Sequence, residues 1–189
     1  MSSAQMWEVK KEPNKRRMAI QLDSTSVTDF VYSEISELSE NKAYVAKGDL
    51  YAYVDSEANE LTPYIFTQVS NFTNGYAIVG DSFHQSILNE KMQMLLPLSF
   101  YEVRLPKHGL IVVQSDEGLW GVYDLMGHEK LPPVYDLPPK ILNRETILVR
   151  KNELYGVVND CNEVVHSINF QYITSAGLGY KQGKYLRLF

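Results

Sequence analysis

Histidine and cysteine side chains, which could bind a metal or act as nucleophiles, are few and scattered along this sequence. Zinc sites place such ligands in short pairs, roughly two to five residues apart. No His-x-x-x-His or Cys-x-x-Cys pair occurs, so we expect no metal site. His128 stands beside Glu129 after a glycine turn, and we interpret both as exposed turn residues. The four histidines are His84, His108, His128 and His166.

Two other features resemble catalytic groups. Asp124 and Asp136 could form a carboxylate pair for general acid–base chemistry. However, Asp124 recurs at one position of a repeat described below, which indicates a turn-forming residue. Cys161 is the only cysteine, and no histidine lies in its turn to activate a thiolate. We therefore expect an exposed surface thiol and not a nucleophile.

The segment 177–184 has the glycines and lysine of a phosphate-binding loop without its spacing. Such a loop needs Gly, four residues, then Gly-Lys and a hydroxyl residue. Here Leu178 occupies the first glycine position and Tyr185 follows Lys184. No Gly-x-Ser-x-Gly motif occurs either. We expect no catalytic residue and no cofactor, and keep an enzyme with a site scattered over several repeats only as a third alternative.

Length and composition favour one globular domain spanning residues 1–189. The chain has 189 residues, 44% of them hydrophobic, and a net charge of -5, which argues against a nucleic-acid binder. The single cysteine allows no internal disulfide and fits a reducing compartment. We find no secretory signal and no stretch long and apolar enough to span a membrane. These observations predict a cytoplasmic protein.

The charge is distributed unevenly. Residues 1–17 carry five basic and two acidic side chains, a net +3, whereas residues 18–75 carry nine acidic and two basic side chains, a net -7. An acidic surface of this kind could steer a basic partner toward the protein. It could equally be a solvated surface that keeps a β-rich protein soluble.

The elements that would position any site repeat about every 34 residues. The clearest copies are 118–124, 153–159 and 49–55, in which Leu and an aromatic residue precede Gly or Ala, two strand formers, and Asp or Asn. The final polar position falls at residues 23, 55, 89, 124 and 159, with spacings of 32, 34, 35 and 35. A fixed period of this length indicates stacked small units.

Each repeat is predicted to contain a β-hairpin, because short alternating apolar runs are divided by Gly, Asn and Asp. After the hairpin we expect a third short strand that ends at a proline, at 61–63, 95–97 and 131–133. A turn or short helix then plugs the core, carrying a pair such as Tyr32 with Ile35, Tyr101 with Val103, or Tyr172 with Ile173. The hairpins expected are 6–10 with 18–22, 43–46 with 50–54, 76–79 with 83–88, 110–113 with 119–123, 147–150 with 154–158, and 178–181 with 185–189.

The predicted fold is therefore all-β, built from tandem repeats of antiparallel hairpin or three-stranded units. We expect an open or partly closed array, with a propeller-like ring as the alternative. No repeat could bury its apolar face alone, so its neighbours must complete the core. The repeats span approximately 6–42, 43–75, 76–109, 110–146 and 147–177, followed by a terminal hairpin at 178–189.

These motifs resemble the bacterial WG β-repeat family, whose units run Gly-x-Trp-Gly, two strand formers and Asp, then Gly, Pro and Tyr. Residues 153–159 match with Tyr155 in place of Trp, and residues 49–79 match through Asp55, Pro63 and Phe72. The resemblance implies a β-repeat scaffold without an assigned reaction, often suspected of binding proteins. The best match is 118–135, with Trp120, Gly121, Asp124, Gly127, Pro132, Pro133 and Tyr135 in place.

We therefore predict a non-catalytic protein-binding module with one protein partner, in the specific form of an inhibitor or immunity-type protein that masks a basic partner. The alternative is a structural module that assembles with copies of itself through exposed strand edges. We expect no contact with membranes or nucleic acid. The candidate partner-binding residues are the acidic Glu34, Glu37, Glu57 and Glu60, and Met92, Met94 and Tyr101 in the repeat that lost its aromatic-Gly pair.

Overall fold

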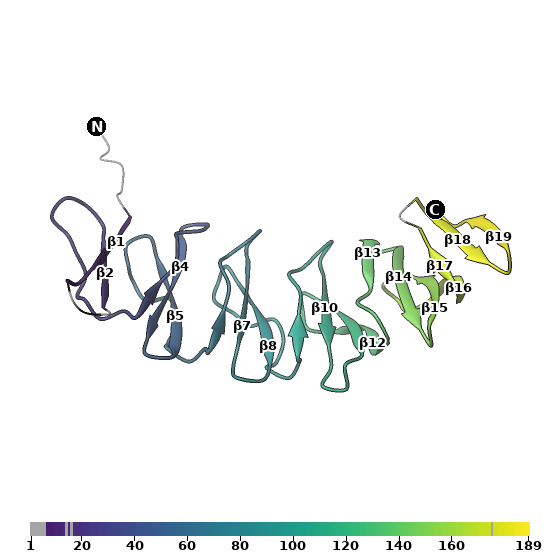
Figure 1. The fold of residues 1–189 in the computed structure, drawn as a ribbon, viewed down its shortest axis with the longest axis horizontal. Coiled ribbons are helices and arrows are strands. Elements are labelled where there is room, and N and C mark those ends of the chain that lie inside the picture. Colours follow the sequence, from purple (N-terminus) through teal and green to yellow (C-terminus); the bar gives the residue numbers. More distant parts are fainter. Residues whose placement is uncertain (1–6, 14, 16, 175) are drawn as a thin grey trace. The chain divides into compact units, whose positions relative to one another are not determined.

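The computed structural model describes residues 7–13, 15, 17–174 and 176–189, and this part of the chain is all-β (Figure 1). It forms small antiparallel sheets with no helix among the described residues, so the predicted fold class is confirmed. Accordingly, no helix in this part is long and apolar enough to cross a membrane. Met6 and Arg16 of the predicted first hairpin lie outside the described residues.

The chain divides into two compact units, Met1–Met94 and Leu95–Phe189, called unit 1 and unit 2 below. The boundary falls inside the predicted repeat 76–109. Whether residues 1–189 act as one domain, and whether the repeats form an array or a ring, stay predictions.

Unit 1 contains a two-stranded and two three-stranded sheets, in the strand orders β1-β2, β3-β4-β5 and β6-β7-β8. Within a sheet, each strand pairs antiparallel with the next strand along the chain. The strands are β1 (Glu8–Lys11), β2 (Met18–Gln21), β3 (Glu34–Ile35), β4 (Lys42–Lys47), β5 (Leu50–Asp55), β6 (Gln68–Val69), β7 (Tyr76–Gly80) and β8 (Gln85–Asn89).

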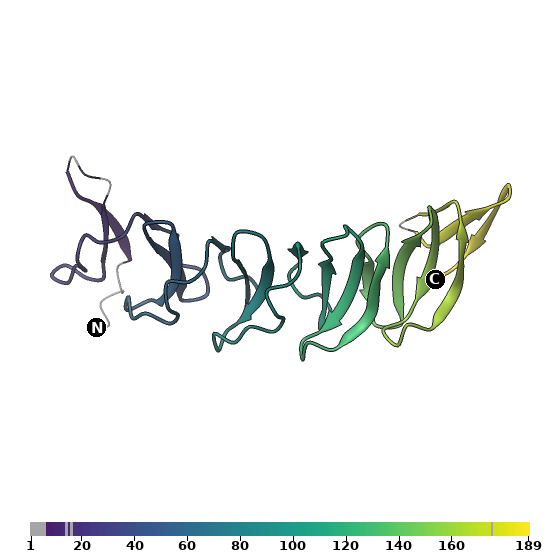
Figure 2. The same cartoon turned by 90° about the horizontal axis from the view of Figure 1, so that it is seen from below.

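Unit 2 contains two four-stranded sheets and one three-stranded sheet, in the orders β9-β10-β11-β12, β13-β14-β15-β16 and β17-β18-β19. In Figure 2 the strands of the β13–β16 sheet lie side by side. The strands are β9 (Glu102–Val103), β10 (Leu110–Gln114), β11 (Trp120–Asp124), β12 (Glu129–Tyr135), β13 (Lys140–Asn143), β14 (Thr146–Lys151), β15 (Leu154–Val158), β16 (Val164–Phe170), β17 (Tyr172–Ile173), β18 (Leu178–Lys181) and β19 (Lys184–Arg187).

The predicted hairpins are confirmed by the pairs β1-β2, β4-β5, β7-β8, β10-β11, β14-β15 and β18-β19. Several boundaries differ by one or two residues. For example, the second strand of the third hairpin begins at Gln85 and not at Phe83. The Asp81 carboxylate accepts hydrogen bonds from the backbone N–H groups of Phe83 and His84, both at 2.8 Å. This side-chain turn competes with strand pairing and delays the start of β8.

The prediction that a turn or short helix plugs the end of each repeat is wrong. Two-residue strands, β3, β9 and β17, contain Ile35, Val103 and the pair Tyr172 with Ile173, and each is the first strand of its sheet. Tyr32 and Tyr101 lie just before β3 and β9. In β3, for example, Glu34 pairs with Ala46 and Ile35 with Val45. Pairing with the following hairpin satisfies backbone N–H and C=O groups that a turn would leave open.

The expected third strand also differs from the prediction. Pro132 and Pro133 do not end a strand, because β12 runs through both to Tyr135. The ladder between β11 and β12 shifts register between Trp120 and Val122, and a bulge on an edge strand tolerates prolines. Residues 61–63 and 95–97 belong to no strand. In unit 1 the equivalent segment forms isolated bridges, Val54 with Glu60 and Tyr51 with Phe66.

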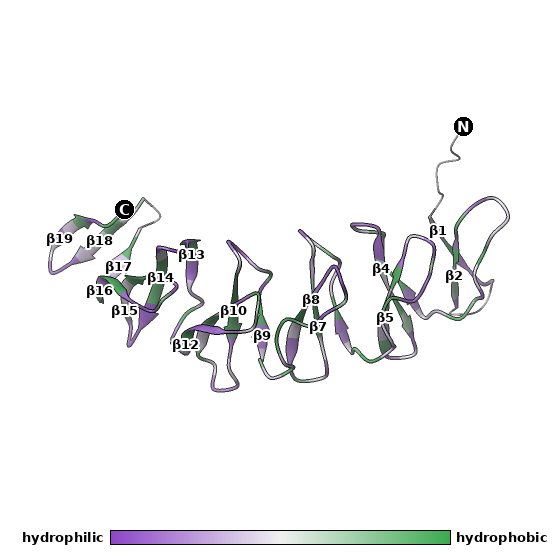
Figure 3. Cartoon of the chain, turned by 180° about the vertical axis from the view of Figure 1, so that it is seen from behind, coloured by the Kyte–Doolittle hydropathy of each residue, from purple (hydrophilic) through white to green (hydrophobic). Residues whose placement is uncertain are grey.

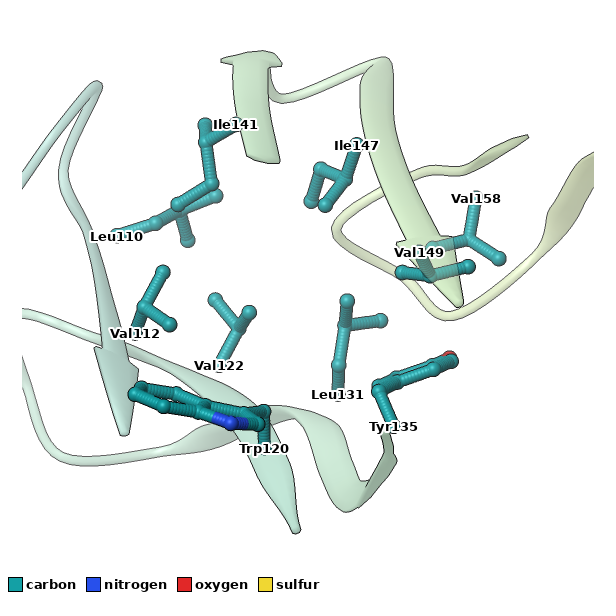
Figure 4. Close-up of a cluster of buried hydrophobic side chains, with 10 residues drawn as sticks. All are labelled: Leu110, Val112, Trp120, Val122, Leu131, Tyr135, Ile141, Ile147, Val149 and Val158. Atoms are coloured by element: carbon teal, nitrogen blue, oxygen red, sulfur yellow. The ribbon is translucent and has the colours of Figure 1, made fainter. Parts of the chain in front are cut away.

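The hydrophobic core lies between successive sheets. Figure 3 shows hydrophobic residues on paired strands such as β10 and β14, and hydrophilic residues on many of the connecting turns. In unit 2, side chains of the β9–β12 sheet pack against those of the β13–β16 sheet (Figure 4). This arrangement supports the expectation that a repeat needs its neighbour. The buried cluster comprises Leu110, Val112, Trp120, Val122, Leu131, Tyr135, Ile141, Ile147, Val149 and Val158.

Candidate binding surfaces

The acidic residues predicted to bind a partner do not form one face of unit 1. Glu34 accepts a hydrogen bond from the Tyr51 hydroxyl at 2.8 Å, and cross-strand pairing puts both on one face of the β3-β4-β5 sheet. Glu60 binds the Lys47 ammonium at 2.8 Å, on the opposite face of the sheet. This hydrogen bond lowers the pKa of Glu60. The structure therefore separates Glu34 from Glu60.

The other predicted residues differ in their exposure. Glu37 and Glu57 are exposed to solvent. Met92 packs against a buried cluster of unit 1, which gives it a structural role. Met94 in unit 1 and Tyr101 in unit 2 are 49% and 62% exposed.

The residues weighed for catalysis lie in turns or at strand ends. Glu129 is exposed but begins β12, so its placement in a turn is wrong. Asp124 accepts hydrogen bonds from the backbone N–H groups of Met126 and His128, both at 2.9 Å, as expected of a turn former. The His128 ring nitrogen lies 3.2 Å from the second Asp124 oxygen. Cys161 is exposed, as predicted. Within the described part of the chain, no three His, Cys, Asp or Glu side chains gather where they could hold a metal ion.

A two-residue turn with the same backbone conformation recurs in three repeats. Both residues of each turn have positive φ: 52° and 59° at Glu40-Asn41, 53° and 81° at Asn74-Gly75, and 52° and 74° at His108-Gly109. These values characterise the type I′ turn, whose twist matches that of a hairpin. In unit 1 the Glu40 carboxylate accepts hydrogen bonds from the backbone N–H groups of Asn74 and Gly75, at 2.6 and 2.8 Å. Glu40 thus links two turns.

The β17-β18-β19 sheet carries three tyrosines on one face. Tyr172 pairs with Tyr180 and Tyr180 with Tyr185, so the rings stand side by side across the strands. The first pair is stacked with centroids 5.0 Å apart, and the second is tilted at 5.1 Å. The hydroxyls of Tyr172 and Tyr185 are 2.6 Å apart, and this hydrogen bond raises the pKa of Tyr172 to about 12. We call these three residues the tyrosine ladder.

In three other sheets, the second strand of the hairpin pairs along its outer edge with the segment that follows it in the chain. These strands are β5, β11 and β15. At the aromatic position of that strand, the partner is another aromatic residue 15 positions later, at 51 and 66, 120 and 135, and 155 and 170. In the first pair, Tyr51 N–H donates to the Phe66 carbonyl at 2.8 Å and Phe66 N–H donates to the Tyr51 carbonyl at 3.4 Å. The pairs are Tyr51 with Phe66, Trp120 with Tyr135, and Tyr155 with Phe170.

Strand β19 has no such cover among the described residues. Tyr185 occupies the aromatic position of its hairpin, and β19 pairs only with β18. The hairpin turns through two residues, so Lys184 and Leu186 form hydrogen-bonded pairs with Lys181 and Gly179. The residues between them alternate, so the N–H and C=O groups of Tyr185 and Arg187 point away from β18. The last sheet therefore has an open edge of backbone donors and acceptors.

A surface hollow of about 650 Å³ lies between β16 and the β18-β19 hairpin. Exposed apolar side chains line part of it, with Tyr185 60% and Leu186 56% exposed. Residues 172–189 hold three basic side chains, Lys181, Lys184 and Arg187, and no acidic one. We call it the C-terminal hollow, and its lining residues include Val165, His166, Phe170, Lys181, Lys184, Tyr185 and Leu186.

Comparison with known families and structures places this geometry in context. Residues 51–80 match the family described as WG containing repeat, and they cover β5, the segment that covers its edge, β6 and β7. This segment is a WG repeat. The predicted family resemblance is thereby confirmed, on the repeat that carries Tyr51-Ala52 in place of Trp-Gly. No curated protein matches the sequence.

Several solved structures are similar to the chain at low sequence identity. Hsv2 of Kluyveromyces lactis is 15% identical with a TM-score of 0.43, over 80% of this chain and 56% of that protein. Hsv2 of Kluyveromyces marxianus is 15% identical with a TM-score of 0.43, over 98% and 66%. The computationally designed protein Ika8 is 12% identical with a TM-score of 0.41, over 95% and 73%. The chain thus spans just over half of the K. lactis protein.

Steric contacts explain why a glycine follows the aromatic residue at 121 and 156. A Cβ added to Gly121 would lie 2.8 Å from the Leu131 carbonyl oxygen, and one added to Gly156 would lie 2.7 Å from Ile168 Cα. Both neighbours belong to the covering strand, whose register shifts at these points. The WG glycine therefore makes room for a bulged covering strand. In the β18-β19 hairpin, Leu186 takes this position.

The tyrosine ladder, the open β19 edge and the C-terminal hollow were not predicted from the sequence. Two signals were present. Residues 172–189 lack acidic side chains, and Leu186 replaces the Gly or Ala of the other aromatic pairs. Neither signal alone predicts which strand edge is unpaired, because the pairing of an edge depends on the segment beside it.

Proposed function

We propose that this WG-repeat chain is a non-catalytic protein-binding module that acts in the cytoplasm. The observation that carries the proposal is the C-terminal hollow, where Val165, Tyr185 and Leu186 expose large apolar side chains beside an open strand edge. Grouped exposed apolar residues rimmed by polar ones mark interaction sites. Tyrosine is also enriched among residues that dominate binding energy at interfaces.

Capture of partners from the native host's lysate by wild type and matched variants tests this proposal. The double variant Val165→Ser, Leu186→Ser removes apolar surface at the hollow. The control Met126→Ser removes an even more exposed apolar side chain from a turn elsewhere in unit 2. We expect a near-stoichiometric partner with wild type and the control, and none with the double variant. Equal capture by all three proteins would contradict the proposal.

The more specific form of this function is an inhibitor or immunity-type protein that masks a basic partner. Residues 18–75 carry a net charge of -7, from nine acidic and two basic side chains, and Glu37 and Glu57 are exposed. Opposite charges across an interface speed association more than they add affinity. This form predicts that the captured partner is basic and that its binding weakens as salt rises.

A self-assembling structural module is the second candidate, and the open edge of β19 favours it, since unpaired strand edges invite pairing with other chains. Light scattering across micromolar concentrations separates the candidates. Mass that grows with concentration supports self-assembly, whereas a constant monomer mass together with a captured partner supports the binding module.

A further inference from the structure

We propose that the open edge of β19 binds one extended, acidic strand of a partner protein, with an aromatic residue of that strand opposite Tyr185. The inference rests on the proposed protein-binding function and specifies the chemistry of the partner. Recognition of this kind takes affinity from backbone hydrogen bonds along a sheet edge, and specificity from alternate side chains.

The backbone of β19 offers the required hydrogen bonds. Leu188 N–H donates to the Gly177 carbonyl at 2.7 Å, which continues the alternation that turns Lys184 and Leu186 toward β18. Tyr185 and Arg187 therefore direct N–H and C=O groups outward, and in the described part of the chain these groups have no partner. The equivalent Tyr51 makes both of its outward bonds to Phe66.

Leu186 restricts what can occupy this edge. In the other sheets of unit 2 the covering strand bulges across Gly121 or Gly156, and a Cβ there would collide with its backbone. At this position the covered strands carry Ala52, Gly121 or Gly156, and Leu186 is larger than any of them. A segment that bulges across β19 as in the other sheets of unit 2 would collide with the Leu186 side chain, whereas a regular, unbulged strand would not cross it. We therefore assign the edge to a strand from another protein.

The side chains define the chemistry of that strand. On one face, the tyrosine ladder ends at Tyr185, so an aromatic residue opposite Tyr185 would extend it, as Tyr135 and Phe170 do beside their aromatic partners. Cross-strand aromatic pairs stabilise a sheet. Lys184 and Arg187 flank Tyr185, so carboxylates on the added strand would meet opposite charges.

A second copy of this chain is a poorer occupant. If β19 paired antiparallel with its own copy, Lys184 and Arg187 of one strand would approach the same residues of the other. Like charges directly opposite each other destabilise a strand pair. Strand β1 also contributes Lys10 and Lys11, so its addition to β19 would bring more positive charge to the edge.

A synthetic heptapeptide, Val-Glu-Glu-Phe-Glu-Glu-Val, tests the proposal, because its carboxylates one and two positions from Phe would lie opposite Lys184 and Arg187; the same peptide bearing Lys for every Glu is its charge control. Proline at 187 removes an N–H that the β18-β19 ladder does not use, so Arg187→Pro blocks strand addition while the hairpin stays paired. Arg187→Gln removes the same charge and keeps the N–H. We expect the acidic peptide to bind wild type, with roughly threefold weaker binding to Arg187→Gln and more than about tenfold weaker binding to Arg187→Pro.

Amide hydrogen exchange of the wild-type protein locates the contact independently of any variant. The N–H groups of Tyr185 and Arg187 should gain protection when the acidic peptide is added, while the lysine peptide has no effect. No protection at either residue, equal binding of both peptides, or equal losses in the two Arg187 variants would overturn strand addition.

The lysate experiment distinguishes failure of this inference from failure of the proposed function. If Arg187→Pro captures the same partner as wild type while Val165→Ser, Leu186→Ser does not, the binding function stands and strand addition is wrong. If all proteins capture the same material, the proposed function itself is wrong. If Arg187→Pro loses the partner and Arg187→Gln retains it, the result supports both strand addition and the protein-binding function.

Discussion

The Glu40 carboxylate holds the turn at Gly75, one repeat further along the chain: Glu40 Oε2 lies 2.8 Å from the Gly75 nitrogen, and Oε1 lies 2.6 Å from that of Asn74. Glu40 itself stands in the equivalent turn of its own repeat. One side chain therefore satisfies two backbone donors in the next turn. The contact connects two repeats of unit 1 at the turns, in addition to the apolar core between their sheets.

Removing the hydrogen bonds from Glu40 to the next turn should lower the stability of unit 1. We expect Glu40→Ala to lower the free energy of unfolding by about 1–2 kcal/mol, because two charge-assisted hydrogen bonds are lost at a solvent-exposed position. Glu57→Ala, which removes an exposed carboxylate in the same unit, is the control and should change stability by less than about 0.5 kcal/mol. Urea unfolding measures both, and equal effects would show that the turn link contributes nothing.

The WG glycine gives a second test. We expect Gly156→Ala to destabilise unit 2 by about 1–3 kcal/mol, because the added Cβ would overlap the Ile168 backbone and force the covering strand outward. Leu186→Ala at the equivalent, uncovered position should cost less than about 0.5 kcal/mol. Thermal unfolding followed by circular dichroism compares the two. A similar loss for both variants would contradict the steric explanation.

Asp23 should titrate at unusually low pH. The backbone N–H groups of Thr25 and Ser26 donate to its carboxylate, both at 2.7 Å, and these bonds lower its pKa from 3.8 to about 2. Since the folded-state pKa is depressed, the turn's stabilisation is full above about pH 4. It disappears as the pH falls through about 2. Carboxyl carbon shifts in NMR report the titration, and a midpoint near 4 in the folded protein would contradict the turn geometry.

Tyr172 should titrate at unusually high pH. Its hydrogen bond with Tyr185 raises its pKa to about 12, so the contribution to stability is complete below pH 10 and lost as the pH rises through about 12. We expect Tyr185→Phe to return the Tyr172 pKa toward 10. The control Tyr101→Phe, just before β9 in the same unit, should leave it unchanged. Ring-carbon shifts of Tyr172 measure both, and no change with Tyr185→Phe would exclude the hydroxyl pair.

Charge reversal tests whether unit 1 steers a basic partner. The double variant Glu37→Lys, Glu57→Lys changes the net charge by +4 at exposed positions. If the captured partner is basic, its association rate should fall several-fold at low salt, and the salt dependence should become shallower. The matched variant Glu37→Gln, Glu57→Gln should show about half the effect. Unchanged association kinetics in both variants would remove the electrostatic form of the proposed function.

The sequence predicted the hairpins well because two local signals agree at each one: alternating apolar residues and a turn former such as Asp124. Two-residue strands such as β3 and β9 carry no such periodicity and are defined only by their pairing partners. The prolines of β12 suggested a strand end, yet the bulge beside Gly121 accommodates them. Local patterns thus located the hairpins, whereas pairing between separate segments determined the remaining strands.

The candidate surface was harder to predict for the same reason. Charge counting identified an acidic segment, but side-chain direction divides it: Glu34 and Glu60 lie on opposite faces of one sheet. The open edge at Tyr185 differs in sequence from the covered edge at Tyr51, with Leu186 in place of Ala52. This difference alone does not predict an open edge, because an edge is open or covered according to the tertiary packing of the segment beside it.

Because the core forms between sheets, and because the turn, aromatic and covering positions recur at one interval, the molecule is modular in length. Insertion or deletion of a complete 34- or 35-residue period would leave each remaining side chain opposite an equivalent neighbour. Deletion of one residue within β11 would instead move its buried side chains to the other face of the sheet. Such a protein can change size by whole repeats far more easily than by single residues.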